Sequence, residues 1–177
     1  GLFHYTDERK SVLETYDSAG RLLLQEGPDG SALTFTYSVD ATATAPTAGY
    51  LVQVTDSAGR FIKFEYALPP GTLDMYAGTS GLISKITNSA GQAIVPTYDT
   101  HLNLVALAWP DGKALQFLYE NSALPWAMTA RKDEMGVVHS TWEYDSEGRA
   151  VSTSLALGAD SYSVAYASPP KYVAAPE

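Results

Sequence analysis

The stretch Tyr144-Asp145-Ser146-Glu147-Gly148-Arg149 occurs in this chain more than once. Tyr16-Asp17-Ser18-Ala19-Gly20-Arg21 is a second copy of the same phrase. Asp56-Ser57-Ala58-Gly59-Arg60 repeats its latter part, and Asn88-Ser89-Ala90-Gly91-Gln92 is a variant of that part. Self-similarity of this kind indicates a repeat architecture, which decides how the rest of the chain is interpreted.

The shared Asp-x-x-Gly core predicts a tight β-hairpin turn. Asp or Asn at the first position can accept a hydrogen bond from the backbone N–H two residues further on, and Gly at the fourth position tolerates a positive φ. Together these features are typical of a type I turn with a G1 bulge. We therefore expect Gly20, Gly59 and Gly148 to have positive φ, each in a turn that begins at the Asp three residues earlier.

A second turn type alternates with the first, at Gly27-Pro28-Asp29-Gly30 and at Trp109-Pro110-Asp111-Gly112. Pro presets φ at the first central position, and Gly again supplies the left-handed residue. In both copies a patterned strand follows, with a Tyr (Tyr37 and Tyr119) placed eight residues beyond the Asp. The residues that we assign to the repeat signature, as structural residues, are Tyr16, Asp17, Gly20, Arg21, Asp56, Gly59, Arg60, Asp111, Gly112, Tyr144, Asp145, Gly148 and Arg149.

The composition predicts an all-β protein. The chain has 177 residues with 12 Tyr, 14 Gly and 10 Pro, and only 18% of its residues are charged, which suits short strands joined by tight turns. Two hairpins are expected in residues 1–37. The later predicted strands are Leu51–Val54, Phe61–Tyr66, Leu82–Thr87, Ala93–Tyr98, Leu104–Trp109, Lys113–Glu120, Trp126–Arg131, Val137–Tyr144, Arg149–Leu155 and Tyr162–Tyr166. This gives about fourteen strands and no convincing helix.

Short turns between successive strands predict an antiparallel meander of repeated β-hairpins, because parallel neighbours would need long crossovers. A single flat sheet would leave one aromatic face in water. The sheet is therefore expected to be curved, and to curl on itself, fold onto a second layer or meet another chain.

The sequence predicts one domain over residues 1–167, followed by an irregular tail at 168–177 that frays. Within the domain, Asp40–Gly49 and Leu68–Ser80 should be the least regular segments, and residues 38–49 are expected to be a mobile connector. The chain begins in mid-pattern at Gly1-Leu2-Phe3, which we interpret as a piece excised from a longer protein.

Charge and residue content exclude several classes of function. The formal net charge of −9 argues against a nucleic-acid partner, because no basic stripe is present to displace counterions from phosphates. The absence of Cys rules out disulfides and thiolate sites. No run of eighteen apolar residues and no signal peptide are present, so membrane insertion is not expected.

The phrase Tyr-Asp-x-x-Gly-Arg resembles the signature of the YD repeats of Rhs (rearrangement hotspot) proteins, which also occur in insecticidal toxin-complex subunits and teneurins. The resemblance covers the chain from Glu14 to Tyr166 and is strongest over Ala130–Tyr166. It implies that this chain is a strip of a hollow β-hairpin shell that encloses a C-terminal toxin domain. The implied partners are neighbouring YD repeats and the enclosed toxin domain of the same polypeptide.

The resemblance further implies a non-enzymatic structural role in a bacterial polymorphic toxin of interbacterial competition. The full-length protein would be secreted, often by type VI secretion, or displayed at the cell surface. The strip is too short to close a shell, so its free sheet edges predict a dimer of the fragment through those edges.

Several residues depart from the family pattern. Leu102 stands where the Tyr98-Asp99 copy should have Gly, and we expect that turn to be of another kind, because a left-handed Leu costs about 1 kcal/mol or more. Gln92 replaces Arg, and Pro96 interrupts a strand, which predicts an edge or a bulge nearby. The self-cleaving aspartate motif of the family is not present, so autoproteolysis is not expected.

No pattern in the sequence predicts catalysis, a metal site or a cofactor. His4, His101 and His139 are not spaced as metal ligands, and we interpret them as surface or packed residues. Most carboxylates lie in the repeated turns, where bonding to the backbone explains them. Asp133 with Glu143 is left open as a glycosidase pair.

Two recurrent features have both a structural and a functional interpretation. Arg21, Arg60 and Arg149 are expected to cover the preceding Tyr or to pair with a turn carboxylate; the alternative is a ladder of positive charge that faces a cargo or a glycan. The aromatic rows are expected to pack in a core or a lumen. The alternative is that they stack on sugars, which would make the chain a carbohydrate-binding surface module.

Overall fold

A computed structural model describes residues 1–7, 9, 11–72 and 81–167. The chain divides into two compact units, Gly1–Ala114 and Leu115–Glu177, which are described separately. The predicted single domain over 1–167 stays a prediction. The predicted tail at 168–177 and most of the predicted irregular segment at 68–80 lie outside the described residues.

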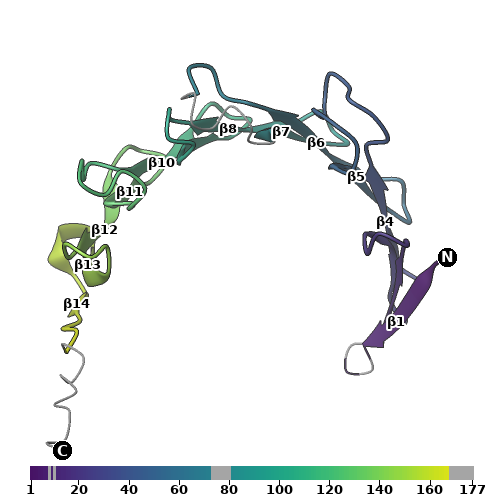
Figure 1. The fold of residues 1–177 in the computed structure, drawn as a ribbon, viewed down its shortest axis with the longest axis horizontal. Helices are drawn as coiled ribbons and strands as arrows, with labels where there is room; N and C mark the ends of the chain where they lie inside the picture. Colours follow the sequence, from purple (N-terminus) through teal and green to yellow (C-terminus); the bar gives the residue numbers. More distant parts are fainter. Residues whose placement is uncertain (8, 10, 73–80, 168–177) are drawn as a thin grey trace, which may run out of the picture. The chain divides into compact units, whose positions relative to one another are not determined.

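The first unit is an antiparallel meander in which each strand pairs with its neighbours in sequence (Figure 1). Its sheet curves from β1 to β9, as the sequence predicts. The strands are β1 (Phe3–Asp7), β2 (Val12–Tyr16), β3 (Leu22–Glu26), β4 (Ala32–Tyr37), β5 (Leu51–Asp56), β6 (Phe61–Ala67), β7 (Leu82–Asn88), β8 (Ala93–Tyr98) and β9 (Leu104–Ala108).

The second unit continues the antiparallel pattern with five strands, the first of which begins at the last residue of the first unit. They are β10 (Ala114–Leu118), β11 (Ala130–Lys132), β12 (Val138–Tyr144), β13 (Ala150–Leu155) and β14 (Ser161–Ser163), with a short 3-10 turn, η2 (Ala156–Gly158), before the last strand. The predicted fold class, an all-β antiparallel meander of hairpins, is confirmed.

The predicted strand Trp126–Arg131 is wrong in its first half. Two successive turns occupy that stretch: the Leu124 N–H donates to the Asn121 carbonyl, and the Ala127 N–H donates to the Leu124 carbonyl, both at 3.0 Å. These turns bury Leu124 and Ala127. The strand begins only at Ala130, because turns hold the backbone from Asn121 to Ala127 in place of ladder pairing.

The two faces of the first unit differ, because residues opposite each other on neighbouring strands share a face. On one face Phe35 lies opposite Val54, which lies opposite Ile62. On the other face Thr34 lies opposite Thr55. Glu65 and Lys85 also lie opposite each other on that face, and their side chains form an ion pair of 3.5 Å. One face is therefore apolar and the other polar.

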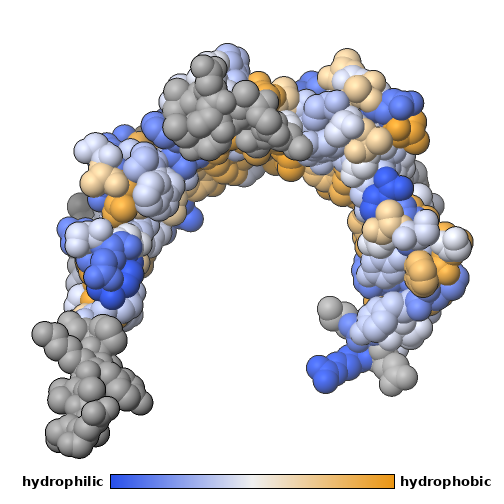
Figure 2. Space-filling model, in the orientation of Figure 1, coloured by the Kyte–Doolittle hydropathy of each residue, from blue (hydrophilic) through white to orange (hydrophobic). Residues whose placement is uncertain are grey.

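The apolar face remains largely open in the described part of the first unit. Ile62 in its middle is 46% exposed, and among the described residues no large side chain is fully buried. Figure 2 shows hydrophobic residues gathered along the concave side of this unit, near β6 to β8. A sheet of one layer cannot cover both of its faces, which is why this face stays open among the described residues.

The insertion between β4 and β5, residues 38–50, has no strand, as predicted, but it is packed rather than a mobile connector. The Ser38 N–H donates to the Tyr50 carbonyl and the Gly49 N–H to the Ser38 carbonyl, both at 2.8 Å. The Tyr66 N–H donates to the Thr44 carbonyl at 2.9 Å. Ala45 is only 1% exposed. The insertion therefore folds back onto β6, which the lack of bulky residues concealed in the sequence.

Candidate functional site: the repeated tyrosine turn

The turns at Asp17, Asp56 and Asp145 have the predicted backbone. The N–H of the Gly three residues later donates to each Asp carbonyl at 3.0–3.1 Å. The φ angles are 81° at Gly20, 80° at Gly59 and 78° at Gly148, so the predicted positive φ is confirmed at all three positions. The Pro-Asp-Gly turn closes in the same way, with the Gly112 N–H donating to the Trp109 carbonyl at 3.0 Å and the Lys113 N–H donating to Asp111 Oδ1 at 3.0 Å.

The Asp side chain holds each Asp-x-x-Gly-Arg turn as a clamp. In the first copy Asp17 Oδ1 accepts the N–H groups of Ala19 (2.8 Å) and Arg21 (2.9 Å), while Arg21 Nε donates to Oδ2 at 2.7 Å. The copies at Asp56 and Asp145 make the same three bonds. The predicted pairing of each Arg with its turn carboxylate is therefore confirmed.

These bonds favour the ionised carboxylates. The Arg21 N–H lowers the pKa of Asp17 below its usual value, and the Arg149 N–H does the same for the pKa of Asp145. At Asp56 partial burial raises the pKa, but the bonds from the side chain and backbone of Arg60 outweigh it and leave the pKa lowered. The clamps are thus charged at neutral pH.

The expectation of another turn type at Tyr98-Asp99 is wrong. Leu102 adopts a φ of 65°, and its N–H donates to the Asp99 carbonyl at 3.1 Å, as Gly does in the other copies. Asp99 Oδ1 accepts the N–H groups of His101 and Asn103, and Asn103 Nδ2 donates to Oδ2, all at 2.9 Å. This complete clamp offsets the backbone strain of a left-handed Leu, which is about 1–2 kcal/mol.

The turns fall at two kinds of place in each unit. At what we call a tyrosine end, an even-numbered strand finishes and the next odd-numbered strand begins; the turns at Asp17 and Asp145 are of this kind. At a plain end, an odd-numbered strand finishes and the next even-numbered strand begins; the turns at Asp56 and Asp111 are of this kind. The Asp56 turn, which the sequence groups with Asp17, therefore belongs to the other end of the hairpin.

Five of the tyrosine ends carry a hydrogen bond that the sequence did not predict. A Tyr near the end of an even-numbered strand donates its hydroxyl to a main-chain carbonyl at or near the start of the preceding strand, 15 or 16 residues earlier. We call this bond a tyrosine rung. The rungs join Tyr37 to Leu22 (3.0 Å), Tyr66 to Leu51 (2.7 Å), Tyr98 to Ile83 (3.0 Å), Tyr144 to Met128 (2.9 Å) and Tyr166 to Ala150 (2.9 Å).

The rung acts where the backbone ladder stops. Between β5 and β6 the paired residues end at Gln53 and Lys63, two residues before Leu51. The Tyr66 hydroxyl then supplies the Leu51 carbonyl with a donor. A register shift between Glu65 and Tyr66, on the side of β7, re-aims the ring at this point. The same shift precedes Tyr37, Tyr98 and Tyr144, and it also precedes Tyr16, whose hydroxyl donates to Glu14 instead. At Tyr98 the shift confirms the bulge predicted beside Pro96.

Two of the signature arginines stack on a rung tyrosine. The Arg21 guanidinium lies 5.2 Å from the centre of the Tyr37 ring, and that of Arg149 lies 4.5 Å from the centre of the Tyr166 ring. The prediction that Arg covers the preceding Tyr is wrong: the covered ring belongs to the next even-numbered strand or its end. Arg60 lies at a plain end, and its side chain is 78% exposed against 41% for Arg21 and Arg149.

The first tyrosine end, at Tyr16, differs from the five ends that carry a rung. Tyr16 donates its hydroxyl to Glu14 Oε2 at 2.6 Å, and this hydrogen bond raises the pKa of Tyr16. The ladder between β1 and β2 runs as far as Tyr16 itself, which lies opposite Phe3. Backbone pairing thus continues to the end of this hairpin, and the Tyr16 hydroxyl bonds to a side chain on its own strand instead of to a main-chain carbonyl.

Comparison with known proteins gives only distant likenesses. No protein-family model and no curated protein matches the chain. Among solved structures, a chain of the "Crystal Structure of TcdB2-TccC3-Cdc42" is similar at 13% identity with a TM-score of 0.46, over 85% of this chain and 9% of that chain. A chain of the "Crystal Structure of TcdB2-TccC3-TEV" is similar at 12% identity with a TM-score of 0.21, over 81% of this chain and 11% of that chain. This chain thus spans about a tenth of the length of each of those two chains.

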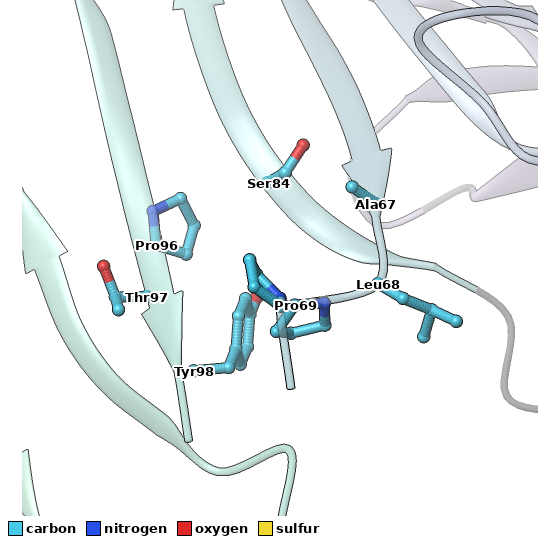
Figure 3. A pocket seen from close by; sticks show the side chains of 8 residues that line it. Ala67, Leu68, Pro69, Ser84, Pro96, Thr97 and Tyr98 are labelled. Atoms are coloured by element: carbon cyan, nitrogen blue, oxygen red, sulfur yellow. The ribbon is translucent and has the colours of Figure 1, made fainter. Parts of the chain in front are cut away.

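A hollow opens at one tyrosine end of the first unit. Backbone pairing between β7 and β8 covers only two residue pairs and stops at Ile86 and Ile94, because Pro96 further along has no N–H to donate. The space left there measures about 250 Å³ (Figure 3). Its lining consists of Ala67, Leu68, Pro69, Pro70, Ser84, Pro96, Thr97 and Tyr98, which include no carboxylate, imidazole or amine. The hollow is a mainly apolar recess in which Ser84, Thr97 and Tyr98 supply the polar side chains.

The candidate catalytic pair of the sequence is not brought together. Asp133 closes the turn before β12, where its Oδ1 accepts the N–H groups of Met135 (3.0 Å) and Val137 (2.9 Å). Glu143 lies near the far end of the same strand and accepts a bond from Ser152 at 2.8 Å. The strand between them places the two carboxylates roughly 16 Å or more apart, beyond the spacing of glycosidase pairs.

The described residues contain no cluster of three or more metal-ligating side chains. Of the three histidines, His4 lies within hydrogen-bonding distance of the Thr15 hydroxyl, with 3.1 Å between Nδ1 and Oγ1. Among those same residues no helix is long and apolar enough to cross a bilayer.

Proposed function

We propose that this chain is a non-enzymatic structural module: a strip of the wall of a YD-repeat shell of the Rhs and toxin-complex kind. The observation that carries the proposal is the tyrosine rung, which recurs five times and consumes the Tyr hydroxyl within the sheet. In a catalytic or binding site, polar groups converge on a ligand. Here they converge on the backbone, which favours architecture.

The faces of the sheet support the same proposal. A wall needs one side suited to an enclosed domain and one side suited to water or to outer layers. The row Phe35, Val54 and Ile62 is apolar and partly exposed, and Thr34 and Thr55 are on the opposite side. We propose that the apolar face meets a toxin domain enclosed by the same polypeptide, which would be secreted or displayed at the cell surface, with type VI secretion as one route.

Neighbouring YD repeats are the second proposed partner. Phe3, the first residue of β1, is 61% exposed, and β1 pairs only with β2 within the described sheet. An edge of this kind offers free N–H and C=O groups to another strand. In the full-length protein a further repeat would take this place; in the isolated chain we expect a dimer through such edges.

The rung tyrosines do not favour the alternative of a carbohydrate-binding module. Sugar stacking needs open aromatic faces, whereas the rings of Tyr37 and Tyr166 lie beneath arginines and those of Tyr66 and Tyr98 are half-buried. Tyr162, which is 69% exposed, is the one member of the aromatic rows with a mostly open side chain among the described residues. A glycan array with a panel of hydrolase substrates separates the readings. We expect no binding on the array and no hydrolysis of any substrate. Saturable glycan binding, or turnover of a hydrolase substrate, would contradict the proposal.

The wall role itself is tested in the full-length protein by protease protection of the enclosed domain. Ile62→Glu places a charge on the apolar face at a position exposed enough to tolerate it, and Lys63→Glu is the matched change on the polar face. We expect Ile62→Glu to expose the enclosed domain to protease and Lys63→Glu to leave it protected. Equal protection in both variants would contradict an inward-facing apolar surface.

A further inference from the structure

Tyr50 and Tyr66 form a pair that the repeat architecture does not require. Their ring centres are 4.6 Å apart with an angle of 63° between the ring planes. Tyr66 belongs to a rung, whereas Tyr50 belongs to the insertion and to no repeat signature. The Tyr50 hydroxyl is buried and makes no hydrogen bond to the described residues. Its placement against Tyr66 therefore calls for a separate explanation.

The backbone holds both members of the pair through the same insertion. The Tyr50 N–H donates to Ser38 Oγ at 3.0 Å, and the Tyr50 carbonyl accepts the Ser38 N–H at 2.8 Å. The Tyr66 N–H donates to the Thr44 carbonyl at 2.9 Å, and its hydroxyl donates to Leu51 at 2.7 Å. These bonds tie both residues to the insertion and hold the two rings next to each other.

We propose that Tyr50 and Tyr66 are a site of oxidative dityrosine cross-linking that staples the insertion 38–50 to β6. The chain has 12 Tyr and no Cys, so a disulfide cannot serve this purpose. A cross-link between positions 50 and 66 would remove conformational freedom from the unfolded chain, as a disulfide does. This inference goes beyond the wall role and does not depend on it.

The chemistry needs a one-electron oxidant, for example a haem peroxidase with hydrogen peroxide. Each phenol loses one electron and one proton to give a tyrosyl radical. The two radicals couple through the ring carbons next to their oxygens, and the hydrogens on those carbons then move to the oxygens to restore both phenols. In sum the pair loses two hydrogen atoms and gains one carbon–carbon bond, while one hydrogen peroxide is reduced to two waters. Pre-positioned rings favour this coupling over encounters between molecules.

The experiment treats the chain with peroxidase and hydrogen peroxide across a dilution series. Blue dityrosine fluorescence reports the product, and tryptic digestion with mass spectrometry locates it. Trypsin separates Tyr50, in the peptide 22–60, from Tyr66, in the peptide 64–85, because it cuts after Arg60 and Lys63. The expected product is these two peptides joined, with the loss of two hydrogen atoms and a yield per chain that does not change on dilution.

Each of these peptides contains a second Tyr, which supplies a matched control. Tyr50→Phe should reduce the joined product about tenfold or more, because it removes the pre-positioned partner, whereas Tyr37→Phe should leave it intact. Fragment-ion assignment in the wild-type chain gives the same answer without a variant. Product that survives Tyr50→Phe, that involves Tyr37, or that appears only between molecules would overturn the proposal.

Discussion

The turns that begin at Asp17 and Asp145 lie at tyrosine ends, whereas the turn that begins at Asp56 lies at a plain end. All three make the same carboxylate clamp with bonds of equal length to Arg Nε. Only at the tyrosine ends does an aromatic ring lie beneath the guanidinium, and the Arg side chain is correspondingly about half as exposed.

This difference shows that the clamp and the rung are separate devices. The clamp needs only residues within one turn, so it forms wherever Asp-x-x-Gly-Arg occurs. The rung needs a Tyr near the end of the second strand of a hairpin, 15 or 16 residues after the carbonyl that it reaches. The clamp therefore fixes individual turns, whereas the rung joins the two strands of a hairpin where their backbone ladder ends.

Acidification should give the largest effect, because it acts on the clamps at both ends. The pKa values of Asp17, Asp56 and Asp145 are lowered in the folded chain, so their contribution to stability is complete above the unfolded pKa and is lost as pH falls through the folded values. We expect the urea midpoint to fall as pH drops below about 4.

The matched control for acidification replaces the three aspartates by Asn. Asn88 already makes the two backbone bonds of the clamp as an amide, with its Oδ1 accepting the N–H groups of Ala90 and Gln92 at 3.0 Å, so the variant should fold. Its urea midpoint should depend less on pH than that of the wild type. An unchanged pH dependence would mean that other carboxylates dominate.

Replacement of the turn glycines should have the next largest effect, and it should be the same at both ends. Gly148→Val and Gly59→Val should each cost about 1–2 kcal/mol through the left-handed backbone penalty. A Cβ at Gly59 meets nothing within 4 Å, and one at Gly148 meets Leu124 at an ordinary 3.6 Å, so packing adds no difference. Urea unfolding measures both; a marked difference between them would contradict the equivalence of the two turns.

Changes at the signature arginines should have the smallest effect and should distinguish the ends. Arg149→Lys keeps the charge but loses the planar contact with Tyr166, so a small, measurable fall in Tm is expected. Arg60→Lys at the plain end should leave Tm unchanged, because that side chain is mostly in solvent. In a Tyr166→Leu background, Arg149→Lys should have no further effect; a persistent loss would assign the role of Arg149 to the clamp alone.

The hairpins, their turns and the positive φ of the repeated glycines could be predicted from sequence, because those features depend on a few adjacent residues. The position of the Asp56 turn at a plain end could also be predicted, because Val54-Thr55 precede it where the copies at Asp17 and Asp145 have Tyr. The left-handed Leu102 was not, because the bonds from Asp99 and Asn103 that offset its strain become visible only in the folded turn.

The rungs and the packing of the insertions could not be predicted from single motifs. Tyr66 and Tyr98 have no Arg in their turns and resemble ordinary strand residues. Their shared role follows from the register, which brings each hydroxyl to a carbonyl on the preceding strand. The turn that buries Ala127 was missed because the apolar stretch Trp126-Ala127-Met128 resembles a strand until its packing is known.

The central claim is that each tyrosine rung joins the two strands of a hairpin beyond the end of the backbone ladder. The free energy of unfolding of a triple Tyr→Phe variant tests this claim most directly. The ladder variant changes Tyr37, Tyr66 and Tyr98, and the control variant changes Tyr5, Tyr50 and Tyr162, for which the structure gives no hydroxyl hydrogen bond. We predict a loss of about 3 kcal/mol in the ladder variant, about 1 kcal/mol for each rung, and little change in the control. Equal stability of the two variants would contradict the account.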